Sequence, residues 1–297
     1  MAQSTAFLTY DAVGNKEDLS DVITNISPTE TPMFSTFGKV KAESTYHEWL
    51  TDSLANAADN AYIEGADYTF VKVAARERLG NYTQIFVTPV EVSDTQRVVL
   101  KAGVEDEFAY QMAKKLKEHA RDIEKALVTG TGNPGASGTA RRLKGVLEWI
   151  STNVTTGSGT GNEALTETMF NDTLQKIWDQ GGQPDTAWVN GFQKRQISSF
   201  SANSTKYVEA DEKKLTATVA VYDSDFGRIK IVLDRFMDAD KVVITQTDLW
   251  KVAVLRPTKK IDVAKVGSST RAVIETELTL ESRNEKGSGK ITQLTTS

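Results

Sequence analysis

The longest helical pattern in the chain starts near residue 93. Ser93 and Gln96 have the spacing of a capping box, and helical periodicity continues to about residue 128. The apolar positions recur every three or four residues and form one narrow stripe on a charged surface: Phe108, Met112, Leu116, Ala120, Ile123 and Leu127. Gly103 is the point where this helix could split or kink. Residues 104–128 alone would span about 37 Å at about 1.5 Å per residue, so we expect a long strut.

A two-stranded excursion is predicted before this helix. Residues 43–50 alternate loosely between polar and apolar side chains, and residues 76–93 do so again. The tract between them, which includes "ANAADNAYIEGADYTF", is mostly polar or small. Because an isolated two-stranded hairpin is marginally stable in water, we expect this one to lean on a body, either its own or that of another chain.

Mixed helical and strand patterns follow the long helix. We expect residues 143–150 to form a strand or a short turn, and residues 151–165 to form a polar loop. A second helix is predicted from residue 166 to the glycines at 181 and 182. Its apolar face comprises Phe170, Leu174, Ile177 and Trp178.

The rest of the chain is rich in strand patterns. Residues 186–190 are expected to form a buried strand, and Asn190 is a suitable N-cap for a helix over 191–200. Several short strands are expected between residues 217 and 256. The tail over 270–284 alternates strictly enough to predict one long strand. Helices and strands together make an α+β protein, and we expect more than one structural unit in 297 residues.

The first 40 residues have little regular pattern. Pro28 and Pro32 push the residues before them toward extended geometry. Three apolar side chains near them are exposed unless something covers them, namely Met33, Phe34 and Phe37. Two interpretations stay open: the arm folds back on its own domain, or it lies on a neighbouring subunit.

Five glycines and a proline lie together in "VTGTGNPGASGTARRLKGV", residues 128–146. A phosphate-binding P-loop needs a preceding strand and a Lys followed by Ser or Thr, and a dinucleotide fingerprint needs a strand, a following helix and a later acidic residue. This stretch instead follows a helix and precedes Arg141, Arg142 and Lys144. We therefore expect a structural corner, whose glycines allow restricted dihedral angles.

Composition narrows the chemistry further. The chain has no cysteine and two histidines, His47 and His119, so disulfides, thiol catalysis and thiolate zinc sites are excluded. We expect no metal and no cofactor, and we expect both histidines to be surface or packing residues. The net charge of −5 and the absence of a basic stripe argue against a protein that grips duplex DNA.

A membrane or enzymatic role has little support. No run of about 18 apolar residues is present, and the N-terminus lacks the pattern of a signal peptide, so we expect a protein made and used in a cytosol. A hydrolase using Asp223 and Asp225 is a weaker alternative. Because both residues lie between two strand patterns, a turn is the favoured interpretation, and we predict no catalytic residue.

The order of elements resembles the major capsid protein of tailed phages, the Hong Kong 97-type fold. The strings "NISPTETPMF" at 25–34, "DIEKALVTGTGNP" followed by "LKGV", "WDQGGQPDTAWVN", "VYDSDFGRIKIV" and "LRP" are similar to its podophage-like branch, formerly a domain of unknown function. Each string is weak alone, and their order carries the resemblance. The competing interpretation within virions is a tail tube or decoration protein, a class that generally lacks a strut helix.

The resemblance implies five segments. They are an N-terminal arm at 1–40, an E-loop hairpin with its flanking strands at 41–92, the spine helix of a P-domain at 93–130, an α/β A-domain with return strands at 131–256, and C-terminal P-domain strands at 257–297. It also implies a structural protein of the virion capsid that assembles in the host cytoplasm into hexamers and pentamers of an icosahedral shell around double-stranded DNA, without sequence-specific binding and without a membrane.

The same resemblance suggests partners and contact residues. Since the arm begins almost at Met1, we expect a separate scaffolding protein and a portal protein. A Lys–Asn crosslink known in some members is not carried over, because its residues have no clear counterparts here. We expect the subunit interface to include Pro28, Pro32, Met33, Phe34, Phe37, Tyr46, Trp49, Tyr62, Tyr68, Phe70, Arg76 and Arg78.

Overall fold

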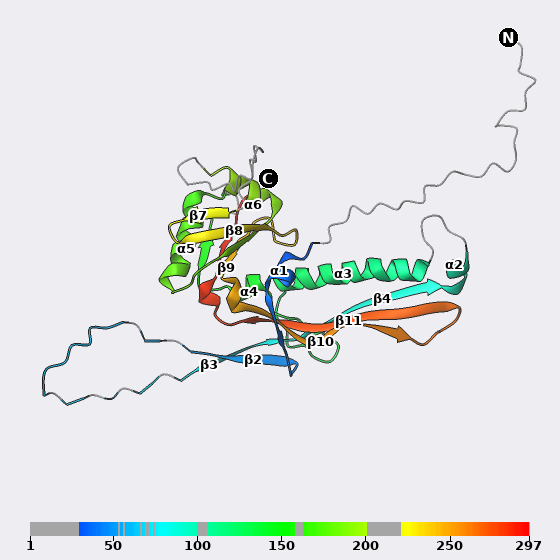
Figure 1. Ribbon diagram of the computed structural model, residues 1–297, viewed down its shortest axis with the longest axis horizontal. Helices are drawn as coiled ribbons and strands as arrows, with labels where there is room; N and C mark the ends of the chain where they lie inside the picture. Colours follow the sequence, from blue (N-terminus) through cyan, green and yellow to red (C-terminus); the bar gives the residue numbers. More distant parts are fainter. Residues whose placement is uncertain are drawn as a thin grey trace, which may run out of the picture.

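The computed structural model of the chain has two sheets and a projecting hairpin (Figure 1). It describes residues 30–296, except residues 53, 56, 66, 69, 71, 74, 100–105, 158–162 and 201–220. A long helix lies along a four-stranded sheet, and a six-stranded sheet stands at one end of that helix (Figure 1). The combination of helices and strands confirms the predicted α+β class. Within the described residues, no helix is long and apolar enough to cross a membrane.

The four-stranded sheet has the order β1-β10-β11-β4. Its strands are β1 (Gly38–Lys41), β10 (Trp250–Val263), β11 (Ser269–Ser282) and β4 (Gln84–Ser93). β10, β11 and β4 pair antiparallel, whereas β1 runs parallel to β10. β11 confirms the long strand predicted at the C-terminal end. Along β4 buried and exposed positions alternate, so one face of the sheet is covered while the other faces outward.

Helix α3 (Glu107–Thr129) covers the inner face of this sheet (Figure 1). With 23 residues it measures about 34 Å at about 1.5 Å per residue, which confirms the strut. Asp106 caps its start by accepting a hydrogen bond from the amide of Phe108. Ser93 caps a separate helix, α2 (Asp94–Val98), through the amide of Gln96. The expected continuous helix is therefore two helices, and Gly103 lies outside the described residues.

The predicted apolar stripe of α3 is only partly correct. Phe108, Ile123 and Leu127 are buried, but Leu116 is 48% exposed. Two polar residues are buried in its place, His119 and Glu124. The reason is that α3 contacts the sheet along one side and the N-terminal segment along another, and both contacts use hydrogen bonds as well as apolar packing.

The six-stranded sheet has the order β5-β12-β9-β6-β8-β7. Its strands are β5 (Val154–Thr156), β12 (Gly289–Thr292), β9 (Val242–Thr245), β6 (Thr186–Val189), β8 (Gly227–Leu233) and β7 (Val221–Ser224). The central strands β6 and β9 are buried at every position. The strand predicted from residue 217 begins at Val221 in the described part, and the turn at residues 225 and 226 confirms the predicted hairpin corner.

Helices α5 (Glu167–Asp179) and α6 (Gly191–Ser198) pack on one face of this sheet. Phe170 and Leu174 of α5 join Ile197 of α6 and Val189 of β6 in one apolar cluster. Asn190 caps α6 as predicted, since its side chain accepts a hydrogen bond from the amide of Phe192. Trp178 was expected on the buried face of α5, but its side chain is 59% exposed and lies beside Phe226.

The other face of the six-stranded sheet packs on a second core that joins both sheets. Trp188 of β6 and Trp250 of β10 flank Phe37, with ring centroids 5.7 and 6.0 Å away. The short helix α4 (Val146–Trp149) belongs to this core. It replaces the strand or turn predicted over residues 143–150, because Val146, Leu147 and Trp149 are buried together on a single helical turn.

The N-terminal segment corrects another expectation. Helix α1 (Pro32–Thr36) leads into β1, and the side chains of Met33 and Phe37 are buried in the chain's own core. The described part of the arm thus folds back on its own subunit. Pro28 lies outside the described residues.

Two predicted segment boundaries also differ from sheet membership. Residue 256, the expected end of one unit, falls in the middle of β10. The last strand, β12, pairs with β5 and β9 rather than with the four-stranded sheet. The chain therefore crosses between the two sheets at about residue 250 and again after β11. Two short 3₁₀ turns, at Thr247–Leu249 and Glu285–Gly287, lie beside these crossings.

Candidate assembly interface

A hairpin projects from the body of the subunit. Its strands β2 (Tyr46–Thr51) and β3 (Glu77–Tyr82) pair antiparallel with each other and with no third strand in the described structure. The connecting residues, 52–76, run far beyond the strands (Figure 1). Every described position of that connection is exposed. This confirms the predicted excursion, and the described residues of the chain leave the loop uncovered.

The loop carries large apolar side chains that contact little of the subunit. Leu54 is 97% exposed and Phe70 is 94% exposed. Ile63, Tyr68 and Val73 are also mostly exposed, and the Tyr62 and Tyr68 rings lie 6.2 Å apart. A group of exposed apolar side chains on one projection is typical of a surface that binds another protein.

The base of the hairpin is held firmly. Trp49 packs against Trp149 of α4 with ring centroids 5.6 Å apart, and Tyr46 packs on Tyr82 at 4.5 Å. A Cβ atom on Gly80 would lie 2.6 Å from the Tyr46 ring, so a side chain there would displace the tyrosine. The hairpin therefore has a fixed root and an uncovered tip.

A hydrogen-bonded contact adds to this root. Nε2 of His47 lies 3.0 Å from Oε2 of Glu281 on β11, and Nε of Arg283 donates to Oε1 of the same carboxylate at 2.8 Å. Burial raises the pKa of Glu281, but the hydrogen bonds from His47 and Arg283 outweigh burial and leave that pKa below its ordinary value. His47 is thus a packing residue that ties the hairpin to the sheet.

The two arginines predicted for the interface lie on the hairpin surface. Arg76 faces Asp52 at 3.5 Å and Arg78 faces Glu48 at 3.1 Å, and both arginine side chains are 69% exposed. Exposed pairs of this kind contribute little to the stability of a single subunit, at most about 1 kcal/mol each. Their charges remain accessible to another chain.

The predicted contact residues fall into three groups. Tyr46, Tyr62, Tyr68 and Phe70 are exposed, Trp49 and Phe34 are half-buried, and Met33 and Phe37 are buried in their own subunit. Pro32 is half-buried at the start of α1. The two buried residues cannot contact a neighbour in this conformation. The prediction failed for them because apolar residues beside prolines are compatible with either open interpretation of the arm.

Sequence reasoning missed a second apolar surface. Ile85 and Val87 of β4 and Ile261 and Val263 of β10 are exposed on the outer face of the four-stranded sheet, opposite α3. The strict alternation of β4 was the signal that could have revealed it. With both Phe86 and Val87 apolar, one face had to be covered by α3 while the other stayed apolar and open.

The glycine-rich corner is structural. Gly135 and Gly138 have φ of +77° and +84°, the left-handed region that favours glycine. The amide of Gly145 donates to the carbonyl of Gly130 at 2.8 Å. A Cβ on Gly145 would lie 2.6 Å from the Gly130 nitrogen, so the two backbones meet where only glycine fits.

Arg141 connects this corner to the sheet. Its Nη2 donates to Oε1 of Glu277 at 2.9 Å, while Thr83 Oγ1 donates to the same oxygen at 2.7 Å and Arg256 Nε donates to Oε2 at 2.8 Å. The Glu277 side chain is almost fully buried. The corner's basic residue therefore neutralises a buried carboxylate of the same chain.

The hydrolase alternative proposed two carboxylates, Asp223 and Asp225, at the turn after β7. Asp223 lies in β7 and faces Arg228 at 3.8 Å, and Asp225 lies in the turn that follows. In the parts of the chain that the structure describes, no three His, Asp or Glu side chains gather as metal ligands would.

Comparison with known proteins agrees with this architecture. The model of the SU10 major capsid protein family matches residues 3–295. The major capsid protein of Escherichia phage Phieco32 is 27% identical, and the alignment covers 97% of each chain. Among solved structures, the capsid of a native GTA particle has a TM-score of 0.70 at 10% identity, over 98% of this chain and 99% of that chain. The Cyanophage A-1(L) capsid has a TM-score of 0.67 at 14% identity, over 98% and 99%.

The structural neighbours show the fold, which is the Hong Kong 97 type expected from the order of elements. The family match covers nearly the entire sequence rather than one unit of it. We conclude that the chain belongs to the SU10 major capsid protein family and is a major capsid protein of a phage.

Proposed function

We propose that copies of this chain join as hexamers and pentamers into an icosahedral shell, with the hairpin loop of each copy lying on a neighbour. The observation that carries the proposal is the contrast between the fixed root of the β2–β3 hairpin and its uncovered apolar tip. Apolar surface that stays in water before association is removed from it afterwards, and that burial favours association. The loop projects from the body of the subunit (Figure 1), and the described residues offer no place to bury these side chains.

The segments have corresponding roles in this proposal. The loop at 52–76 with its strands serves as the E-loop, α3 and the four-stranded sheet serve as the P-domain, and the six-stranded sheet with α5 and α6 serves as the A-domain. The arm would act through residues before α1 and through the half-buried Phe34. Tyr62, Tyr68, Phe70, Arg76 and Arg78 are the contact residues that best fit the observed exposure.

Charge is compatible with enclosing a genome. The chain carries a net charge of −5, and an acidic wall would not hold double-stranded DNA tightly, because strong binding requires cations that displace counterions from phosphates. The proposed contact with DNA is therefore weak and independent of sequence. The role is structural rather than enzymatic, in a virion assembled in the host cytoplasm, with separate scaffolding and portal proteins as partners.

Negative-stain electron microscopy of the purified full chain tests the proposal. We expect closed shells, rings or sheets of capsomers under conditions that promote assembly. Phe70→Ser, at the uncovered tip, should reduce their yield at least about tenfold, the effect of losing about 1.4 kcal/mol per contact. Leu116→Ser, an exposed apolar position on α3, is the matched control and should assemble normally.

Two outcomes would contradict the proposal in different ways. A wild-type chain that stays a monodisperse monomer would overturn the shell-building role itself. Normal assembly of Phe70→Ser would leave that role intact and overturn the assignment of the hairpin loop as the contact.

A further inference from the structure

A buried carboxylate holds the N-terminal segment on the long helix. Glu124 lies on α3 with no exposed surface. Its Oε1 accepts a hydrogen bond from the amide of Met33 at 2.6 Å, and its Oε2 accepts one from the amide of Phe34 at 2.9 Å. Both amides belong to the first turn of α1, so one side chain of α3 binds the backbone of the arm directly.

A second buried carboxylate acts on the first through its charge. Asp234 follows β8 and is 1% exposed. Its Oδ1 accepts a hydrogen bond from the amide of Phe236 at 2.8 Å, whereas its Oδ2 is buried and has no hydrogen-bond partner within the described structure. The charge of Asp234 acts on Glu124 and disfavours its ionisation. Glu124 belongs to α3, and Asp234 directly follows a strand of the six-stranded sheet.

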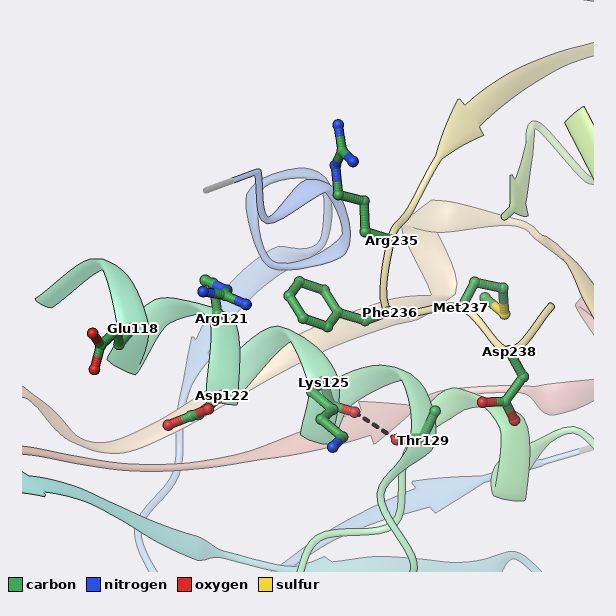
Figure 2. A pocket seen from close by; sticks show the side chains of 9 residues that line it. All are labelled: Glu118, Arg121, Asp122, Lys125, Thr129, Arg235, Phe236, Met237 and Asp238. Atoms are coloured by element: carbon green, nitrogen blue, oxygen red, sulfur yellow. Dashed lines mark hydrogen bonds between the residues drawn. The ribbon is translucent and has the colours of Figure 1, made fainter. Parts of the chain in front are cut away.

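The basic groups nearby do not neutralise this pair. Arg121 lies one turn before Glu124, but its guanidinium is placed over the Phe236 ring, 6.0 Å from the centroid. Figure 2 shows Arg121 directed toward Phe236 and Arg235 turned away from it. Lys39 of β1 is placed over the Phe34 ring at 4.3 Å. No salt bridge to either buried carboxylate is present among the described residues.

Other charged groups of α3 and of the loop after β8 line a hollow. This hollow lies between α3 and the loop after β8 and has a volume of about 540 Å³ (Figure 2). Acidic and basic side chains alternate around it: Glu118, Arg121, Asp122, Lys125, Arg235 and Asp238. Since these charges are mixed, none imposes a strong field of one sign on the carboxylates.

We propose that Glu124 and Asp234 form a proton-dependent latch, which holds helix α1 on α3 while the pair keeps a proton and loosens when both groups ionise. Two buried carboxylates whose charges act on each other cannot both be ionised at low cost. A proton on the pair removes that repulsion. Opening the contact between α1 and α3 hydrates Glu124. This also relieves the repulsion, but the arm is then no longer held on α3.

The direction of the pH effect follows from the two groups. Burial, with a smaller contribution from the charge of Asp234, raises the pKa of Glu124 to about 7 against the opposing effect of the two amides. Burial also raises the pKa of Asp234 to about 6. The closed state, with α1 on α3, binds the proton more tightly than the open state, in which Glu124 is hydrated. The latch is therefore strongest below the ordinary carboxyl pKa. It weakens as the pH rises through about 6 to 7.

Apolar contacts limit what the latch releases. Phe37 packs between Trp188 and Trp250 and contains no titratable group, so its anchoring is independent of pH. The loosened part is therefore α1 itself, including Met33, rather than β1. The latch acts within one subunit and does not depend on shell formation.

Hydrogen exchange on the full, unassembled chain between pH 5.5 and 8.5 tests the latch. After correction for intrinsic exchange, the protection of the Met33 and Phe34 amides should fall at least about tenfold as the pH rises, since one pKa unit corresponds to about tenfold. Glu124→Gln cannot ionise and should give a flat profile. Glu118→Gln removes the same charge from the same helix and should keep the wild-type profile.

Other results would overturn the latch. They are a flat wild-type profile, or a Glu124→Gln profile as steep as that of wild type. If Glu124→Gln fails to fold, Asp234→Asn provides the test. Loss of the neighbouring charge should move the fall in protection to lower pH, and an unchanged midpoint would exclude the pair as its cause.

Discussion

Apolar side chains are buried in the six-stranded sheet but exposed in the hairpin loop. Strands β6 and β9 are buried at every position and lie between two apolar clusters. The loop over residues 52–76 is exposed at every described position, although it contains Leu54, Ile63 and Phe70. The central strands of the sheet are covered by the chain's own clusters, whereas the described residues leave the loop uncovered.

This contrast separates the stability of the subunit from its assembly. Side chains in the sheet stabilise the fold because they leave water when one chain folds. Side chains of the loop stay in water at that stage, and in the proposed shell they gain burial on association. Substitutions in the two regions should therefore change different measurements.

The largest expected effect comes from Leu174→Ala in α5. Leu174 is fully buried, and a leucine-to-alanine change at such a site costs about 3 to 5 kcal/mol, including the cavity it leaves. The same change at Leu54, which is 97% exposed, should alter the free energy of unfolding by less than about 0.5 kcal/mol. Urea unfolding of the unassembled chains measures both values. If both variants lost the same free energy of unfolding, the loop would stabilise the single subunit as much as the sheet region does.

A smaller effect is expected for Glu277→Gln. The carboxylate accepts hydrogen bonds from Thr83, Arg141 and Arg256 in a buried position, and replacing a buried charged partner costs about 3 kcal/mol. Arg76→Ala, which removes an exposed pair of the hairpin, should cost less than about 1 kcal/mol. The comparison again uses the free energy of unfolding in urea. If Glu277→Gln left the free energy of unfolding unchanged, the hydrogen bonds to this carboxylate would not stabilise the glycine-rich corner.

The smallest effect concerns pH and His119. This histidine lies on the buried side of α3, with Nδ1 2.9 Å from Thr88 Oγ1 and Nε2 2.8 Å from Thr276 Oγ1. Burial lowers its pKa, while Asp122 opposes that change. Because the folded state favours the neutral ring, its contribution to stability is complete above the ordinary histidine pKa and is lost as the pH falls through the lowered value.

The His119→Gln variant isolates this contribution. The difference in unfolding free energy between wild type and variant should shrink between pH 7.5 and pH 5. Taking the difference removes the opposite pH effect of Glu124 and Asp234, which both proteins share. A difference that is constant over this range would show that the ring stays neutral in both states or is charged in both.

Periodic elements were predictable from the sequence. The strut, the helices α5 and α6, and the strand β11 follow from spacing, with Asn190 marking the start of α6 and the glycines at 181 and 182 marking the end of α5. The hairpin was predictable too, because a polar tract separates two alternating segments. In these parts the local preference and the tertiary environment agree.

Contacts between distant segments were not predictable. Met33 and Phe37 looked exposed because nothing local covers them, yet their partners are Glu124 on α3 and the tryptophans Trp188 and Trp250. The buried Glu124 breaks an apolar stripe for the same reason. Its role depends on a backbone that lies 90 residues away in sequence. The exposed Trp178 shows the converse, an apolar residue that the periodicity places inward and the packing leaves outside.

Gly130, which follows α3, and Gly145, which precedes α4, determine where the chain can accept insertions. One backbone hydrogen bond, from Gly145 to Gly130, brings the two ends of residues 131–144 together. The tip of this closed lobe, residues 136–140, is open to solvent. Its entry and exit are thus fixed independently of its length, so extra residues spliced in at Ser137 would extend the lobe outward while the frame on either side keeps its shape.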